Sequence, residues 1–296
     1  MRQGDPRPQP ANAEDKANTR RRRKLAVGPG KGKFLIRIRL AHVTDRYAPM
    51  IAKKSIGAVK LDLLLRTIAL LPDDAGARKP GYVLRDWGYE HLHDLVREGP
   101  ISRTKQDLPD REVRHLKRKW VDNQVRKLVA ARLLRVQPVP GKRPRLIVLR
   151  DDGRGGAFDD PGATGDNPYV TIRGSLIASD TFAAWGAPEV AAMLAALYAE
   201  FYAERPRGRP LSADGTGRWW RQLAWFNNPA WHPLGRPMLP FSKSLLERGF
   251  ATLAEQRLIT RTRVLHDPRT KKRFPISRVV YRNRFTRLDG AARRVS

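Results

Sequence analysis

Residues 242–259 read SKSLLERGFATLAEQRLI, and this stretch, with the segment that follows it, decides the predicted fold. Apolar residues recur in it at helical spacing, and the opening serine stands where an N-cap residue is preferred, so the pattern predicts a capped amphipathic helix. Two apolar and basic segments then flank the cationic run 266–273, which predicts a β-hairpin with a cationic tip. From Arg257 to Arg287 there are eleven Lys and Arg residues against one acid, Asp267. A helix and a hairpin with this positive charge are suited to binding the phosphates of a nucleic acid.

The whole chain is strongly basic, with 59 Lys and Arg against 29 Asp and Glu and a net charge of +30 over 296 residues. The excess positive charges repel one another in a compact fold, so such a composition indicates a polyanionic partner. Nucleic acid is the favoured partner, and an anionic membrane surface is the second choice. No window approaches the ~18 apolar residues of a membrane span, and no signal-peptide segment follows the N-terminal charges. The absence of cysteine excludes disulfides and thiolate metal sites. We therefore expect a cytoplasmic protein without a cofactor, and the arginine-rich composition suggests a bacterial one.

Charge also divides the chain into segments. The net charge is +7 over 1–33, +14 over 34–150, −4 over 151–168 and +13 over the remainder. The first segment lacks apolar periodicity and predicts a disordered basic arm. The third is rich in Gly and Asp and predicts a linker that is too polar to pack. Folded domains are expected over 34–150 and 169–288, with 289–296 as a tail.

The two predicted domains repeat one order of elements. Each begins with a strand, continues through helices, and ends in a basic helix that leads into a hairpin. The first copy predicts a strand over 34–40, helices over 59–71, 87–96 and from about 110 to 133, and a strand–turn–strand over 134–149. The step from helix to hairpin is alike in both copies: LVAARLL at 128–134 and LAEQRLI at 253–259.

This order resembles the winged helix-turn-helix family over about 57–150 and 169–288. The resemblance implies a mainly helical α+β fold with two winged-helix domains, each a three-helix core with a β-hairpin wing. Its recognition helices would lie near 111–127 and 242–257. Residues near the start of such a helix reach base edges in the major groove, whereas wing cations hold phosphates.

Candidate DNA-binding residues follow from the polar faces of these elements. In the first copy they are Arg111, Arg114, Lys117, Arg118 and Asn123, with Lys142, Arg143 and Arg145 in the wing. In the second copy they are Ser242, Lys243, Ser244 and Arg248, with Arg269, Lys271, Lys272, Arg273, Arg278 and Arg282 in the wing.

We therefore expect a sequence-specific double-stranded DNA-binding protein. Two tandem winged helices with an arm resemble, in architecture, the initiators of iteron-type plasmid replication. That resemblance implies binding to origin repeats and, as partners, a second copy of the chain and host replication proteins. A transcriptional regulator with the same fold, and a sequence-neutral nucleoid or RNA-binding protein, are alternatives.

One alternative is an enzyme. The sequence His91-Leu92-His93, with Tyr198 and Tyr202 downstream, resembles the metal site and paired nucleophiles of rolling-circle nickases. However, the two histidines share a face only on a strand, and Tyr89, Leu92 and Val96 fit helical spacing. No catalytic or metal-binding residue is therefore expected.

Overall fold

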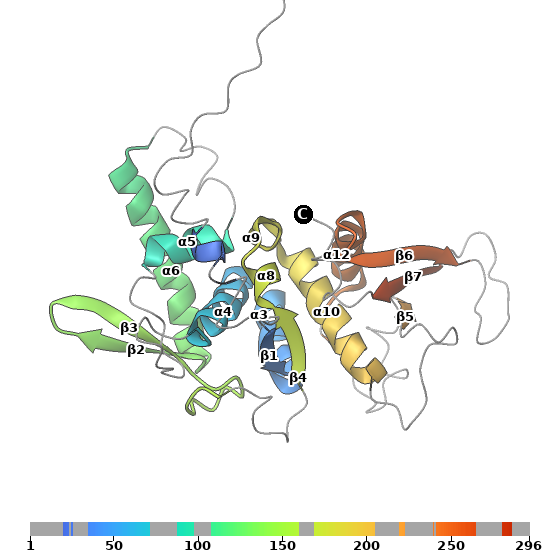
Figure 1. Ribbon diagram of the computed structural model, residues 1–296, viewed down its shortest axis with the longest axis horizontal. Helices are drawn as coiled ribbons and strands as arrows, with labels where there is room; N and C mark the ends of the chain where they lie inside the picture. The colour runs from blue at the N-terminus through green and yellow to red at the C-terminus, as the bar shows by residue number, and fades with distance from the viewer. Residues whose placement is uncertain are drawn as a thin grey trace, which may run out of the picture.

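The structure is a computed structural model and describes residues 20–23, 25, 35–71, 88–97, 108–159, 169–204, 219–222, 239, 241–264 and 280–285 (Figure 1). These residues form a mainly helical α+β fold with small antiparallel sheets. None of the helices described is both long enough and apolar enough to cross a membrane.

The first half of the chain contains a strand, a run of helices and a hairpin. In order these are β1 (Leu35–Arg39), α2 (Leu40–His42), the π-helix η1 (Val43–Tyr47), α3 (Ala48–Ala52), α4 (Ile56–Ala69), α5 (Tyr89–Val96), α6 (Asp110–Ala130), β2 (Leu134–Val139) and β3 (Lys142–Val148). The predicted strand, three helices and hairpin are therefore confirmed. The turns α2, η1 and α3 were not predicted.

The second half follows a similar order. It contains β4 (Tyr169–Arg173), α8 (Gly174–Ile177), α9 (Asp180–Ala184), α10 (Ala187–Glu204), β5 (Trp219–Gln222), α12 (Lys243–Glu255), β6 (Ile259–Val264) and β7 (Val280–Phe285). Strands β5, β7 and β6 form a three-stranded sheet in that order, whereas β2 and β3 form a two-stranded one.

Strands β1 and β4 join the two halves in an antiparallel ribbon (Figure 1). Its register centres on Arg37 opposite Thr171, and the second and fourth residues of each strand are buried. Each strand opens its own half and pairs with its counterpart, so the pairing has the symmetry of a local twofold axis. One cluster of buried apolar residues runs through both halves. The two predicted domains therefore share a core.

Two segments that were expected to be free of the fold contribute to it. Within the predicted arm, Leu25 is fully buried, and Arg22 donates to the backbone oxygens of Asp94 (3.1 Å) and Ala178 (3.1 Å). Within the predicted linker, Asp151 is buried and pairs with Arg39 of β1. The predictions of a disordered arm and a non-packing linker are wrong for residues 20–25 and 151–159 as far as these are described, because their polar groups find partners far along the chain.

Helices α10 and α12 approach each other closely at Gly249. A Cβ atom at this position would lie 2.7 Å from the Cβ atom of Ala192 and would overlap the backbone of Pro188. We expect Gly249→Ala to lower the free energy of unfolding by about 1–3 kcal/mol, because overpacking outweighs the gain in helix propensity. Urea denaturation measures this change. Ser244→Ala, on the exposed face of α12, is the control, and a more stable Gly249→Ala protein would contradict the close approach.

A buried polar network connects η1, α4 and the segment after β3. One carboxylate oxygen of Asp62 accepts hydrogen bonds from the Tyr47 hydroxyl (2.7 Å) and the Arg66 Nε (2.8 Å), and lies 3.4 Å from the His42 Nε2. Arg66 also donates to the backbone oxygen of Leu149 (3.2 Å). Burial alone would raise the pKa of Asp62, but the Arg66 guanidinium and His42 outweigh it and lower the pKa to about 2.

This network predicts a loss of stability in mild acid. Burial lowers the pKa of His42 below its ordinary value of 6.5, although the hydrogen bond to Asp62 acts in the opposite direction. The unfolded chain therefore binds a proton before the folded chain does, and the free energy of unfolding should fall as the pH drops below about 6.5. Urea denaturation between about pH 7 and 5 measures this slope. We expect the slope to diminish in His42→Gln and to persist in His115→Gln, which changes an exposed histidine; equal slopes in both variants would contradict the assignment.

Candidate nucleic-acid interface

Helix α6 is the longest of the helices described, with 21 residues. It follows Pro109, and its first turn carries Asp110 and Glu112, whose negative charges favour a helix N-terminus. One face is buried, by Val121, Gln124, Val125 and Leu128. Trp120 extends that face: it is half-buried and packs edge-on against the ring of His93. The opposite face is left exposed.

Two predicted contact residues on α6 are paired with acids of α5. Lys117 donates to Asp94 (2.8 Å), and its side chain is only 19% exposed. Arg118 donates from its Nε to Glu90 (2.7 Å), and its side chain is 51% exposed. Lys117 therefore belongs to the α5–α6 contact, whereas Arg118 is held in place with part of its guanidinium on the surface.

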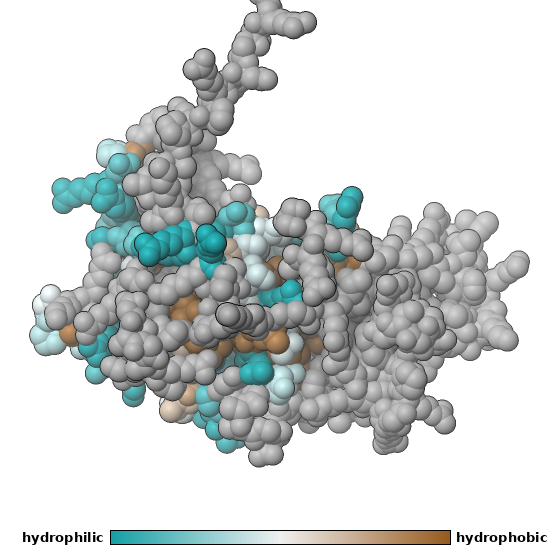
Figure 2. Space-filling model, viewed as in Figure 1, coloured by the Kyte–Doolittle hydropathy of each residue, from teal (hydrophilic) through white to brown (hydrophobic). Residues whose placement is uncertain are grey.

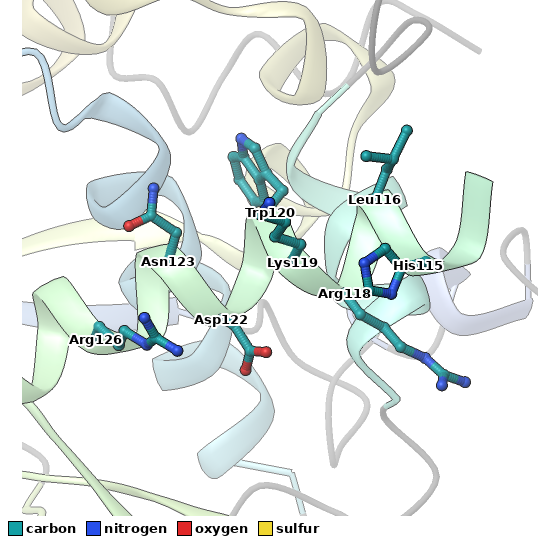
Figure 3. Close-up of a pocket in the computed structure, with 8 residues that line it drawn as sticks. All are labelled: His115, Leu116, Arg118, Lys119, Trp120, Asp122, Asn123 and Arg126. Atoms are coloured by element: carbon teal, nitrogen blue, oxygen red, sulfur yellow. The ribbon is translucent and has the colours of Figure 1, made fainter. Parts of the chain in front are cut away.

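The remaining predicted residues of α6 lie on its exposed face. Arg111, Arg114 and Asn123 are exposed, as is Lys119, which was not among the predicted residues; none of the three cations has an acidic partner among the described residues. Hydrophilic side chains gather over this end of the molecule (Figure 2). A shallow depression of about 640 Å³ runs along the helix, and two of the predicted contact residues, Arg118 and Asn123, line it together with Leu116 and Trp120 (Figure 3). It is also lined by four exposed residues that were not predicted, His115, Lys119, Asp122 and Arg126. Their regular spacing on the polar face of α6 was the signal available in the sequence.

The hairpin β2–β3 follows α6 directly. Its strands pair from Leu134 opposite Val148 to Val139 opposite Lys142, with an irregularity next to Pro138, and Gly141 takes a positive φ of 64° in the turn. Arg145 is half-buried. Lys142 and Arg143 stand at the start of β3, and their side chains lie outside the described part.

Helix α12 presents the second group of predicted residues. The Ser242 side chain accepts a hydrogen bond from the backbone N–H of Leu245 (3.2 Å), which confirms the predicted N-cap. Leu246, Phe250 and Leu253 are buried, as the helical spacing predicts. Ser242, Lys243, Ser244 and Arg248 are all exposed near the start of the helix.

The two copies end their long helices in the same way, which is also seen at Lys54 after α3. Arg132 after α6 and Arg257 after α12 both have positive φ, 57° and 59°. In each copy the next residue donates from its backbone N–H to a leucine oxygen five positions earlier: Leu133 to Leu128 (3.0 Å) and Leu258 to Leu253 (2.9 Å). This is the Schellman cap, which usually takes glycine at the position with positive φ. The similarity of LVAARLL and LAEQRLI is thus a similarity of backbone conformation, and it sets the angle between each helix and its hairpin.

The second predicted wing is described only in part. Strands β6 and β7 pair antiparallel from Ile259 opposite Phe285 to Val264 opposite Val280, which confirms the hairpin. Arg282 lies in β7, but its side chain is not described. The predicted tip residues Arg269, Lys271, Lys272 and Arg273, and Arg278, lie outside the described residues.

The motif that suggested a nickase lies on helix α5. His91 and His93 are two positions apart on a helix, so their side chains point to different faces, and His93 is buried. Tyr198 is buried in α10, and the Tyr202 side chain is not described. Among the described residues there is no cluster of three His, Cys, Asp or Glu side chains that could hold a metal ion.

A scan against protein-family models finds no match to this chain, and neither does a search of curated proteins or of solved structures.

Proposed function

We propose that the protein is a sequence-specific double-stranded DNA-binding protein with two winged-helix modules, in which α6 and α12 are the recognition helices. The observation that carries this proposal is the repeated unit of helix, Schellman cap with an arginine of positive φ, and antiparallel hairpin. In each copy, the unit places an exposed polar helix face beside a hairpin whose sequence is basic.

The charge distribution supports DNA as the ligand. Arg111, Arg114 and Lys119 are exposed on α6 and have no acidic partner among the described residues, so they are available for phosphates or base edges. Arg118 is oriented by Glu90, which favours a fixed geometry over a diffuse attraction. Asp122 and Asn123 beside these cations add groups that can accept from cytosine and pair with adenine.

Selection of bound duplexes from a random pool by the full chain tests this function. A specific binder yields an enriched motif and retains a preference of ~10³ or more over random duplex at ~150 mM salt. Equal binding to all duplexes, or a preference for single strands or RNA, would overturn the proposal. Direct repeats of the motif at a replication origin favour the role of a plasmid or mobile-element replication initiator, whereas an inverted repeat at a promoter favours a transcriptional regulator.

We expect Arg248→Ala to relax specificity at one or two base pairs. Arg248 is exposed in the second turn of α12, where a recognition helix reaches base edges, and an arginine–guanine pair contributes ~1–3 kcal/mol of discrimination. Binding to the selected site and to its single-base variants measures this. The controls are Lys271→Ala and Lys272→Ala, at residues predicted from the sequence to lie in the wing, which should weaken binding to every sequence alike. If all three variants behave in the same way, the division into reading and anchoring residues is wrong.

A further inference from the structure

A second surface of the first module lies beside the proposed DNA-binding face. Val129, near the C-terminus of α6, is the only large apolar residue among those described that is exposed, at 41%. A groove of about 600 Å³ extends from it across Val125 of α6 to Leu134 and Val136 of β2, the strand that packs against this helix (Figure 1).

The rim of the groove is cationic. Arg126, Arg132 and Arg135 line it, none of its lining residues is acidic, and none of these three arginines has an acidic partner among the described residues. All three are exposed. The groove thus combines an apolar floor with a positive edge.

We propose that this groove, defined by Val125, Val129, Leu134 and Val136 with its three arginines, binds an acidic segment of a partner protein that carries apolar side chains. Apolar side chains of such a segment would cover the floor, and its carboxylates would pair with the arginines. Arg126 also lines the depression on the adjacent DNA-binding face, but the proposal does not depend on DNA recognition by that face.

Charge and chemistry favour this occupant over two others. In a symmetric dimer formed through this groove, the three arginines of one copy would face the same three arginines of the other. These like charges would repel each other, in a chain that already carries a net charge of +30. A DNA backbone would place hydrated phosphates over valine and leucine side chains, which gain little from such a contact. An acidic and apolar segment satisfies both the floor and the rim.

A fluorescence anisotropy titration with three synthetic peptides tests the proposal on the full chain. The peptides alternate glutamate with leucine, glutamate with serine, and lysine with leucine. We expect the glutamate–leucine peptide to bind at least about tenfold more tightly than either control, because only it matches both floor and rim.

Two variants assign the binding to the groove. Val129→Ser removes the exposed apolar side chain and should weaken the glutamate–leucine peptide by about tenfold, while Val129→Ile retains it. Arg132→Gly removes a rim charge at a position whose positive φ glycine adopts without strain, and should also weaken the peptide. Neither Val129 substitution should alter affinity for duplex DNA by more than about twofold.

Three results would overturn the proposal. The first is the absence of peptide binding, or binding that is unchanged in Val129→Ser. The second is a dimer in sedimentation that Val129→Ser dissociates, which would assign the groove to a second copy of the chain. The third is a loss of DNA affinity in Val129→Ser as large as its loss of peptide affinity, which would make the groove part of the DNA-binding face.

Discussion

Replacing Asp62 with alanine is expected to lower the free energy of unfolding by about 3–5 kcal/mol. Asp62 is fully buried, and its carboxylate is the anionic partner of Arg66, which is itself 2% exposed. Without the carboxylate, the guanidinium remains buried and keeps one hydrogen bond to a described residue, the backbone oxygen of Leu149, and the Tyr47 hydroxyl loses its acceptor. A buried cation without its anion is far more costly than the loss of one hydrogen bond. Urea denaturation at pH 7, with the tryptophan fluorescence as readout, measures the change.

Two variants separate the loss of the anion from the loss of volume. Asp62→Asn keeps the shape of the side chain and removes its charge, so most of the destabilisation should remain. Asp62→Leu combined with Arg66→Met removes both charges and should restore part of the stability, because replacement of both members of a buried pair is far less costly than removal of one. Asp45→Ala, an exposed carboxylate in η1, is the control. A change no larger in Asp62→Ala than in Asp45→Ala would show that the network contributes little.

The Asp62 network also shows a limit of prediction from this sequence. The apolar spacing of α4 was sufficient to predict a helix, but it gave no reason to place an ionised aspartate and arginine inside the core. Their partners come from η1 and from the residue after β3, and the separation between Arg66 and Leu149 is 83 residues. A local sequence pattern cannot predict a contact between residues so far apart in the chain.

Elements with local signals were predicted well. The Ser242 cap, the apolar spacing of α12 and the Pro109 start of α6 each depend on residues within one or two turns, and each is confirmed. The hairpins followed from pairs of apolar and basic segments on either side of a basic run. Local chemistry determines these features, so a single sequence is sufficient to reveal them.

The arrangement of the halves was not predicted for the same physical reason. Strand β1 was correctly identified, but its partner β4 begins 130 residues after β1 ends. The sequence of neither strand indicates which other strand it pairs with. The acidic segment after β3 was read from its composition as a linker. Its first residue, Asp151, is instead an ion-pair partner of Arg39, 112 residues away. Among the predicted contact residues, nothing in the sequence indicated that Lys117 pairs with Asp94, which lies on another helix.

The surface of α6 gives the largest expected effect on DNA binding. We expect the double variant Arg114→Ala, Lys119→Ala to bind duplex DNA about 30-fold more weakly at ~150 mM salt. Both side chains are exposed and have no acidic partner among the described residues, so each can neutralise one phosphate. Each such contact releases counterions and contributes ~0.9 to the slope of log K against log salt, so the slope should decrease by about 2 in magnitude. Fluorescence anisotropy over a series of salt concentrations yields both quantities.

A matched double variant controls for the loss of two charges from a chain of high net charge. Lys53→Ala, Arg154→Ala also removes two exposed cations, but they lie after α3 and in the loop after β3, outside the proposed interface. Long-range attraction alone would weaken binding equally in both double variants, because it depends on net charge. If α6 contacts phosphates, the slope of log K against log salt changes only in the Arg114→Ala, Lys119→Ala variant. An equal slope in the two variants would remove α6 from the DNA-binding surface, and with it the main support for a reading helix in the first module.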